Sequence, residues 1–354
     1  MPDWTKSMQQ TFEYYQVDPG TWGDVKLIDN VKKCQIRRDM DSDTLGSATI
    51  DITESVGECY IRVYLITIQN GVRERFPLGT FLVQTPSSSF DGRIRNVSMD
   101  AYTPLLELKE NPVPLGYYIP KDVNLMDQAY LLTSEHARAP VVRTKSNKTV
   151  YSDFVADTND NWLTYLSSLI ANNKYYYDLD EMGRILFAPK QDTASLTPIW
   201  TFDDGNSSIL QPSITMDHDL YGIPNVVEVL YSSNSGEVYY AKVVNDDESS
   251  PTSIVNRGRP ITKYITNPEM TGDPTDYMIQ EYAKQYLRDV SSVEYTISYT
   301  HGYCPVRVGD CVRLNYNRAG LTDIKARVIS QNISCEAGCM VSEKAVFTRK
   351  LWEG

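Results

Sequence analysis

Short segments in which hydrophobic and polar residues alternate run through residues 12 to 102. SATIDIT, CYIRVYLITI and GTFLVQT are three of them, and turn signals such as DPG, QNG and DGR separate several segments. A period of two puts every second side chain on one face of a β-strand. Short strands at regular spacing are typical of a sandwich or barrel. We therefore predict a first antiparallel β-barrel domain over residues 1–105.

The stretch RFPLGTFLVQTPSSSFDGRIRNVSMDAY, residues 75–102, predicts a hairpin of this domain. In its second strand Ile94, Val97 and Met99 alternate imperfectly with polar residues. Such a strand turns one face to a core and the other to water. The stretch holds no cluster of residues suited to chemistry, so we expect a structural role for it.

The pattern changes after Tyr102, where Pro112, Pro114 and Pro120 predict a linker or an irregular crossing. Two helices are expected next, one from about residue 125 and one that Asp160 or Asn161 can cap. The second helix carries an apolar face of Trp162, Leu163, Leu166, Leu169 and Ile170. Two strands joined by a turn follow it, and we predict a middle α+β domain over residues 106–215.

Alternation returns near Asn225 and resumes after residue 291, which predicts a second β-barrel domain over 216–245 and 291–354. The interruption, 246–290, is expected to be a helical insertion with a helix near 275–290. A core-facing stripe is predicted for that helix at Met278, Tyr282, Ala283, Tyr286 and Leu287. The expected fold class is mainly β with α+β insertions, with two similar β domains. A glycine before a strand, a turn and a long strand, at Gly79 and again at Gly309, suggests a crude internal repeat.

Composition adds a preference for β structure and interfaces. The chain has 354 residues, of which 41% are hydrophobic and 23% charged, and it holds 25 tyrosines. Tyrosine has an apolar ring and a polar tip, which suits half-buried strands and contact surfaces. An ordinary globular composition argues against long disorder.

The net charge of -12 is concentrated in one part of the chain. Residues 151–250 hold 16 acidic and 4 basic residues, whereas the remainder holds 30 of each. This distribution disfavours binding of nucleic acid through a basic face. We interpret the one dense basic stretch, VKKCQIRR at 31–38, as a strand with solvated lysines and arginines.

The N-terminus lacks the basic and apolar regions of a signal peptide, and no apolar run of about 18 residues occurs. We expect a chain that is neither exported by a signal peptide nor inserted into a membrane. Four cysteines fall within 36 residues, Cys304, Cys311, Cys335 and Cys339, at spacings looser than zinc knuckles use. We expect these, with Cys34 and Cys59, to be free thiols without metal, although a zinc site stays open as the alternative.

A search for chemistry finds no nucleophile elbow, metalloprotease helix, P-loop or dinucleotide-binding motif. The three histidines, His136, His218 and His301, have no evident partners in the sequence. The segment DTNDNW begins like a calcium loop with Asp157, Asn159 and Asn161, but Trp162 and Ser168 stand where the loop needs glycine and glutamate. Two acidic pairs, Asp203 with Asp204 and Asp217 with Asp219, fit solvated turns better than a glycosidase site. We therefore expect no enzyme activity and no cofactor.

The order of elements resembles the tail hub proteins of bacteriophages. The resemblance rests on LGTFLV, a DG turn and VSMD, then the proline-rich crossing, then W-x3-L-x2-L, DEMGRI and finally VGDCVRL. It covers nearly the whole chain and points to the trimeric baseplate hub of contractile tails and to the N-terminal part of siphophage tail-associated proteins. Several relatives continue into a peptidase or fibre region, whereas this sequence stops soon after its last expected strand.

The resemblance implies a structural virion protein, assembled in the host cytoplasm and located at the tail tip. Each subunit of the family contributes two similar barrels, so a homotrimer presents six and adapts the sixfold tail tube to a threefold tip. The implied partners are a distal tail or tail-tube protein and a fibre, spike or tape-measure protein, with DNA passing through the lumen unrecognised. The acidic third then faces either the lumen or the exterior.

Partner contacts are expected on polar turns that interrupt the apolar alternation. In QNGVRER these are Asn70 and Arg73, and in NYNRAG they are Asn317 and Arg318. Simple solvated turns are the alternative for each of them.

Two rival functions remain open at this point. A host-surface carbohydrate-binding module of a phage tail would expose Trp4, Trp22 or Trp200. A hydrolase would use Asp203 or Asp217.

Overall fold

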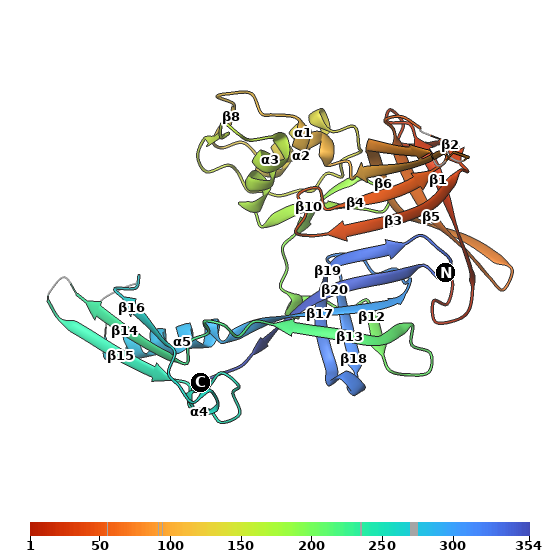
Figure 1. Ribbon diagram of the computed structural model, residues 1–354. Coiled ribbons are helices and arrows are strands. Elements are labelled where there is room, and N and C mark those ends of the chain that lie inside the picture. Colours follow the sequence, from red (N-terminus) through yellow and green to blue (C-terminus); the bar gives the residue numbers. More distant parts are fainter. Residues whose placement is uncertain (55, 91, 94, 234–235, 270–274) are drawn as a thin grey trace. The chain divides into compact units, whose positions relative to one another are not determined.

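The computed structural model describes residues 1–54, 56–90, 92–93, 95–233, 236–269 and 275–354. These residues form two compact units (Figure 1). Unit 1 comprises Met1–Ile214 with Ser298–Ala345, and unit 2 comprises Thr215–Ile297 with Val346–Gly354. Most of the structure is β, with large antiparallel sheets and a few helices, so the predicted fold class is confirmed. The predicted turn at Asp91 and the predicted strand position Ile94 lie outside the described residues.

The first β part of unit 1 follows the alternation of the sequence. Its strands are β1 (Gln9–Val17), β2 (Asp24–Ile28), β3 (Val31–Asp39), β4 (Gly46–Ile52), β5 (Tyr60–Gln69), β6 (Val72–Phe90) and β7 (Arg95–Tyr102). They pair antiparallel in the order β3-β4-β7-β6-β5-β1-β2. In β4, for example, Ala48, Ile50 and Ile52 are buried while the residues between them are not. Period-two patterning therefore located these strands except β2, which the sequence did not predict.

A second group of strands continues the same sheet. It consists of β12 (Trp200–Asp203), β13 (Leu210–His218), β17 (Ser292–Gly302), β18 (Cys311–Tyr316), β19 (Leu321–Ser334) and β20 (Met340–Lys350). The sheet order is β13-β17-β20-β19, and β18 pairs β19 while β12 pairs β18 in parallel. β19 then pairs antiparallel with β3, from Ser330 opposite Asp39 to Ser334 opposite Gln35. The two β parts of unit 1 are thus joined edge to edge into one sheet.

Two predicted boundaries are corrected by this pairing. Residues 200–215 were assigned to the middle domain, but β12 and the start of β13 belong to the large sheet. Residues 216–245 were assigned to the second β-barrel domain, but β14 (Val226–Ser232) and β15 (Val238–Val244) form a separate three-stranded sheet with β16 (Thr262–Thr266). Alternation shows that a strand has a buried face, but it does not say which sheet the strand joins.

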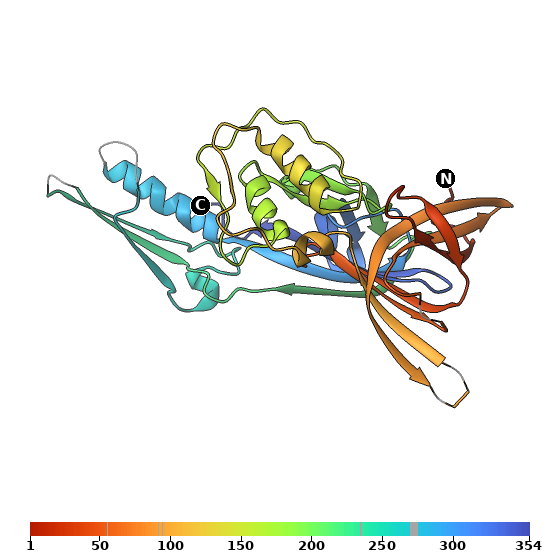
Figure 2. The ribbon, with the colours of Figure 1, turned by 90° about the horizontal axis from the view of Figure 1, so that it is seen from above.

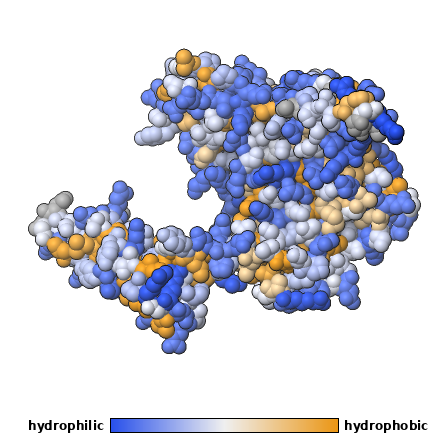
Figure 3. All heavy atoms as spheres, in the orientation of Figure 1, coloured by the Kyte–Doolittle hydropathy of each residue, from blue (hydrophilic) through white to orange (hydrophobic). Residues whose placement is uncertain are grey.

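Unit 2 is built from this small sheet and one long helix. It also contains the short α4 (Ile254–Arg257), while α5 (Asp276–Val290) packs Ile279, Ala283 and Leu287 against β14 and β15. The predicted apolar stripe is therefore partly right. Ala283 and Leu287 are buried as predicted, but the buried residue of the first turn is Ile279, whereas Met278 is only half-buried. Figure 3 shows hydrophobic surface on this unit. The exposed apolar and aromatic side chains of its strands are Leu230, Val238, Tyr240 and Tyr264.

The middle part of unit 1, between β7 and β12, combines short helices and strands. Its elements are α1 (Leu106–Glu110), β8 (Tyr118–Ile119), α2 (Leu125–His136), β9 (Phe154–Val155), α3 (Trp162–Ala171), β10 (Tyr175–Leu179), β11 (Ile185–Pro189) and the 3-10 turn η1 (Thr193–Ser195). Asn161 caps α3 in a reciprocal capping box with Thr164. The helices bury a core that includes Leu166, Leu169 and Met126.

A long ribbon projects from the first β part. β6 pairs with β5 only from Val72 to Leu82, and its later residues pair with β7 alone, as far as Phe90 opposite Arg95. Figure 2 shows this two-stranded ribbon extending away from the rest of the sheet. This ribbon is the hairpin that the sequence predicted, and it extends beyond the last residue of β6 that pairs with β5.

Candidate assembly surface

The predicted contact residues of the first β part lie at the tip of the β5–β6 hairpin. Gln69 pairs with Val72, which leaves Asn70 and Gly71 as a two-residue turn, both with positive φ. Asparagine and glycine tolerate that backbone, so Asn70 is suited to the turn itself. Arg73 donates from Nη2 to Glu13 Oε1 at 2.6 Å, and its side chain is 54% exposed. The guanidinium thus has a partner within the chain and an open side.

The predicted contact residues of the second β part lie in the 3-10 turn η2 (Asn317–Ala319), between β18 and β19. The side-chain oxygen of Asn317 accepts a hydrogen bond from Thr322. Arg318 lies 3.8 Å from an Asp204 oxygen, and its side chain is 76% exposed. The four residues therefore occupy two separate hairpin turns, and their role in assembly stays a prediction.

The two glycines of the suggested repeat have different surroundings. Gly79 lies within β6, beside a bulge in the β5–β6 ladder, and a Cβ there would lie 2.6 Å from the ring of Phe81. Gly309 lies in the turn before β18 with φ +95, and a Cβ there would lie in ordinary contact distance, 3.6 Å from the hydroxyl of Tyr176. A crude match of sequence order is therefore not a match of local structure.

A buried polar network supports the β3–β19 seam. Arg38 donates to Leu78 O at 2.6 Å and to Gln331 Oε1 at 3.0 Å. Gln331 in turn donates to Val306 O at 2.9 Å and to Glu343 Oε1. Because these partners belong to β6, β19 and β20, Arg38 connects both β parts of unit 1. The interpretation of the basic stretch as solvated was wrong for this residue.

Glu343 gathers partners that are distant in the sequence. Its carboxylate accepts from Tyr299 OH at 2.7 Å and lies 3.2 Å from His301 Nε2. His301 and Glu343 are essentially buried, and burial together with Glu343 raises the pKa of Tyr299 well above its usual value. His301 Nε2 thus lies close to this carboxylate without meeting hydrogen-bond geometry, and the sequence did not reveal this neighbour.

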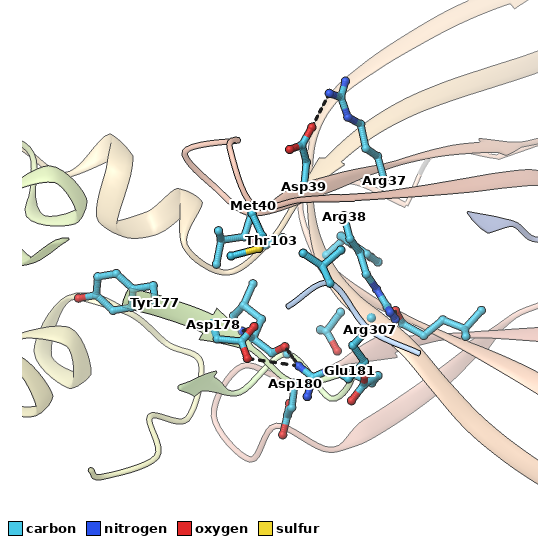
Figure 4. Close-up of a pocket in the computed structure, with 18 of the residues that line it drawn as sticks. Arg37, Arg38, Asp39, Met40, Thr103, Tyr177, Asp178, Asp180, Glu181 and Arg307 are labelled. Carbon is cyan, nitrogen blue, oxygen red and sulfur yellow. Dashed lines mark hydrogen bonds and ion pairs between the residues drawn. The ribbon is translucent and has the colours of Figure 1, made fainter. Parts of the chain in front are cut away.

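A cavity of about 60 Å³ lies in unit 1 between β6, the β10–β11 turn and the loop before β18. Figure 4 shows Arg307 close to Asp178, Asp180 and Glu181 at this place. Arg307 Nε lies 2.6 Å from Glu181 and its Nη2 lies 3.6 Å from Asp178. Burial raises the pKa of the Asp178 carboxyl. The space is far below the roughly 300 Å³ of a typical ligand pocket, so we interpret it as part of the packing at the seam.

A second network fixes the middle part to the first β part. Arg62 is 1% exposed and donates to Thr80 Oγ1 and Asp24 Oδ1, each at 2.8 Å. It also donates to Met182 O at 3.2 Å, in the β10–β11 turn. Asp24 has two further partners, Tyr64 OH at 2.7 Å and Arg75 at 2.9 Å. This charge is therefore buried with its hydrogen bonds satisfied, as burial of an ion requires.

The residues considered for chemistry have structural surroundings. Asp203 Oδ1 accepts from the backbone of Gly205, and Asp219 Oδ1 accepts from the backbone of Tyr221, as turn carboxylates do. Asp217 belongs to unit 2 whereas Asp203 belongs to unit 1. Trp4 and Trp22 are buried and Trp200 is half-buried, so the exposed tryptophans that a carbohydrate-binding module would need are not found at these positions.

All six cysteines are free thiols, and Cys59 alone among them is not buried. In the described ranges, no three or more His, Cys, Asp or Glu side chains are grouped so as to hold a metal ion. Nor is any helix in the described part of the chain both long and apolar enough to cross a membrane.

No protein-family model matches the chain, and no curated protein sequence matches it. Several solved structures do share its fold. A tail protein from Neisseria meningitidis is 12% identical with a TM-score of 0.61, covering 96% of this chain and 96% of its own. The 43 kDa tail protein of prophage MuSo2 from Shewanella oneidensis is 13% identical with a TM-score of 0.61, covering 95% of this chain and 98% of its own.

A Francisella PdpA-VgrG complex provides a third similar structure, at 11% identity and a TM-score of 0.54. That match covers 96% of this chain and 58% of the other. The similarity thus extends over nearly the full length of this chain in all three cases. The chain shares its fold with these two tail proteins and with part of the PdpA-VgrG complex, as the order of its sequence motifs indicated.

Proposed function

We propose that the chain is a structural virion protein, a tail or baseplate hub that forms a trimeric ring at the tail tip. The observation that supports it most is the fold, shared over at least 95% of both chains with two phage tail proteins. The pairing of β3 with β19 adds a geometric reason, because it joins the two β parts of unit 1 into one sheet. Each copy can then contribute two segments to the wall of the ring. Three copies supply six segments, which suits an adaptor between a sixfold tube and a threefold tip.

In this proposal the protein acts by binding its neighbours in the tail, and no reaction is assigned to it. The hairpin turns with Asn70 and Arg73, and with Asn317 and Arg318, meet neighbouring proteins of the tail. Those neighbours are a distal tail or tail-tube protein on one side and a fibre, spike or tape-measure protein on the other. DNA passes through the ring without being recognised by sequence.

The number of copies in the ring tests the proposal. Light scattering of the full chain bound to its tail-tube or distal-tail partner is expected to give three copies per ring. Electron micrographs of tails in which the chain carries a small tag are expected to place it at the tip with threefold symmetry. Two or four copies, or a label along the tube, would contradict the hub function.

A further inference from the structure

The turn between β10 and β11 is a short segment that its own hydrogen bonds hold in shape. We call residues 180–184 of this turn the clamp. Gly183 N donates to Asp180 O at 2.9 Å. The Asp180 carboxylate accepts from the backbone N–H of Arg184 at 2.8 Å and from its guanidinium at 2.5 Å. The clamp therefore has a defined shape of its own, independent of its neighbours.

One side of the clamp is bound to the first β part. The carbonyl oxygen of Met182 accepts three hydrogen bonds from that part. The donors are Trp22 Nε1 at 2.8 Å, Thr80 Oγ1 at 2.9 Å and Arg62 Nη2 at 3.2 Å. Gly183 lies so close that a Cβ there would be 2.6 Å from Thr80 Cβ and 3.3 Å from the ring of Trp22. This contact leaves no room for a side chain at position 183.

The other side of the clamp is bound to the second β part. Arg307, in the loop before β18, has its Nε 2.6 Å from a carboxylate oxygen of Glu181, and it also donates to Leu179 O (Figure 4). Nearby, Arg327 of β19 donates to the hydroxyl of Tyr176 in β10 at 2.9 Å. The clamp and the end of β10 thus contact both β parts of unit 1 at once.

The junction that the clamp bridges is short. β3 and β19 pair over five residue pairs, from Ser330 opposite Asp39 to Ser334 opposite Gln35. Neighbouring strands in a sheet are rotated by roughly −10 to −35° relative to each other, so pairing alone leaves the angle between the two β parts variable. A further contact that is bound on both sides of the junction restricts this angle.

We propose that the clamp holds the two β parts at one angle and thereby sets the curvature with which copies of the chain join. The second half of this inference rests on the proposed ring. Identical subunits close into a ring only when each presents its two contact surfaces at the angle that closure requires. Gly183 is in this sense a positioning residue, because a side chain there would push the clamp away from Thr80 and Trp22.

Hydrogen exchange measured by mass spectrometry on the full chain tests the clamp. Gly183→Ala is expected to speed exchange in peptides covering 35–39 and 330–334 about tenfold, because these strands separate more often when the clamp is displaced. Peptides of β5, which pairs within the first β part, should keep their rates. Gly116→Ala is the matched control, because φ is +77 at Gly116 and +76 at Gly183, but nothing lies within 4 Å of a Cβ at Gly116. The control should leave the β3–β19 junction unchanged.

Glu181→Gln provides a second variant that is expected to fold even if Gly183→Ala does not. Its side chain is 25% exposed, and the substitution weakens only the ion pair with Arg307. Exchange at the junction should rise about threefold, in keeping with the small contribution of a partly exposed ion pair. Wild-type exchange rates at the junction in the folded variants overturn the proposal. An equal increase over all of unit 1 also overturns it, since that result shows a general loss of stability.

Electron micrographs of tails separate the clamp from the hub function. Gly183→Ala is expected to give fewer complete threefold tips than Gly116→Ala, and equal numbers overturn the effect on curvature. Faster exchange at the junction in a chain whose wild-type tips show no threefold ring would refute the hub function and leave the hold of the clamp on the junction standing. Threefold wild-type tips together with unchanged exchange would refute the clamp and leave the hub function standing.

Discussion

Arg62 provides a sharp test of how the middle part is held on the first β part. Replacement by methionine keeps much of the volume but removes hydrogen bonds to Thr80, Asp24 and the carbonyls of Trp22 and Met182. Hydrogen bonds that involve a charged group contribute about 1.5–3 kcal/mol, and breaking a buried ion pair costs about 3–5 kcal/mol. Asp24 keeps Tyr64 and Arg75 as partners, which reduces the cost. We therefore expect Arg62→Met to lower the free energy of unfolding of unit 1 by about 2–4 kcal/mol.

Arg75→Met is the matched control for this experiment. Arg75 binds the same carboxylate at 2.9 Å, but its side chain is 36% exposed. Its loss is expected to cost only about 1 kcal/mol, since exposed ion pairs contribute little even with a ring contact such as the one Arg75 makes to Tyr64. Urea unfolding followed by tryptophan fluorescence measures both variants, because Trp22 lies beside Arg62. Equal losses for the two variants, or a loss below about 1 kcal/mol for Arg62→Met, would refute the argument that burial decides the cost.

Three further predictions concern the cysteines, one histidine and the hairpin turns. Thiol titration is expected to count six thiols in denaturant. In the native protein Cys59 should react first but slowly, because burial raises its pKa to about 11. Elemental analysis is expected to find no zinc, and stoichiometric zinc that is lost on Cys304→Ser would contradict this. Burial lowers the pKa of His136 below its usual 6.5, so protonation favours the unfolded state, and the free energy of unfolding should fall as the pH drops through about 6.5. His136→Phe preserves the stacking on Trp162. Urea titrations between about pH 5 and 7 should therefore show a weaker pH dependence for this variant. Arg73→Glu with Arg318→Glu is expected to leave circular dichroism unchanged and to weaken ring assembly, and undiminished incorporation into tails would show that these turns face solvent.

The sequence determined those features that depend on neighbours along the chain. Alternation located six of the seven strands of the first β part, because period-two patterning can be read within a few residues, but it did not locate β2. The cap of α3 was narrowed to two residues for the same reason, and Asn161 is the one that accepts the hydrogen bond. The overall order of elements was enough to indicate the fold of phage tail proteins.

Which of these elements meet depends on contacts between residues that are far apart in the sequence. His301 and Glu343 are 42 residues apart, and Arg38 reaches Gln331 across 293 positions, so no local pattern could pair them. Hydrophobic and polar residues alternate in β14 and β15 much as they do in strands of the large sheet, yet β14 and β15 belong to another sheet and pack on α5. Hydrophobic periodicity records that a face is buried but not the surface that buries it, because strand pairing is settled by long-range contacts of the whole chain.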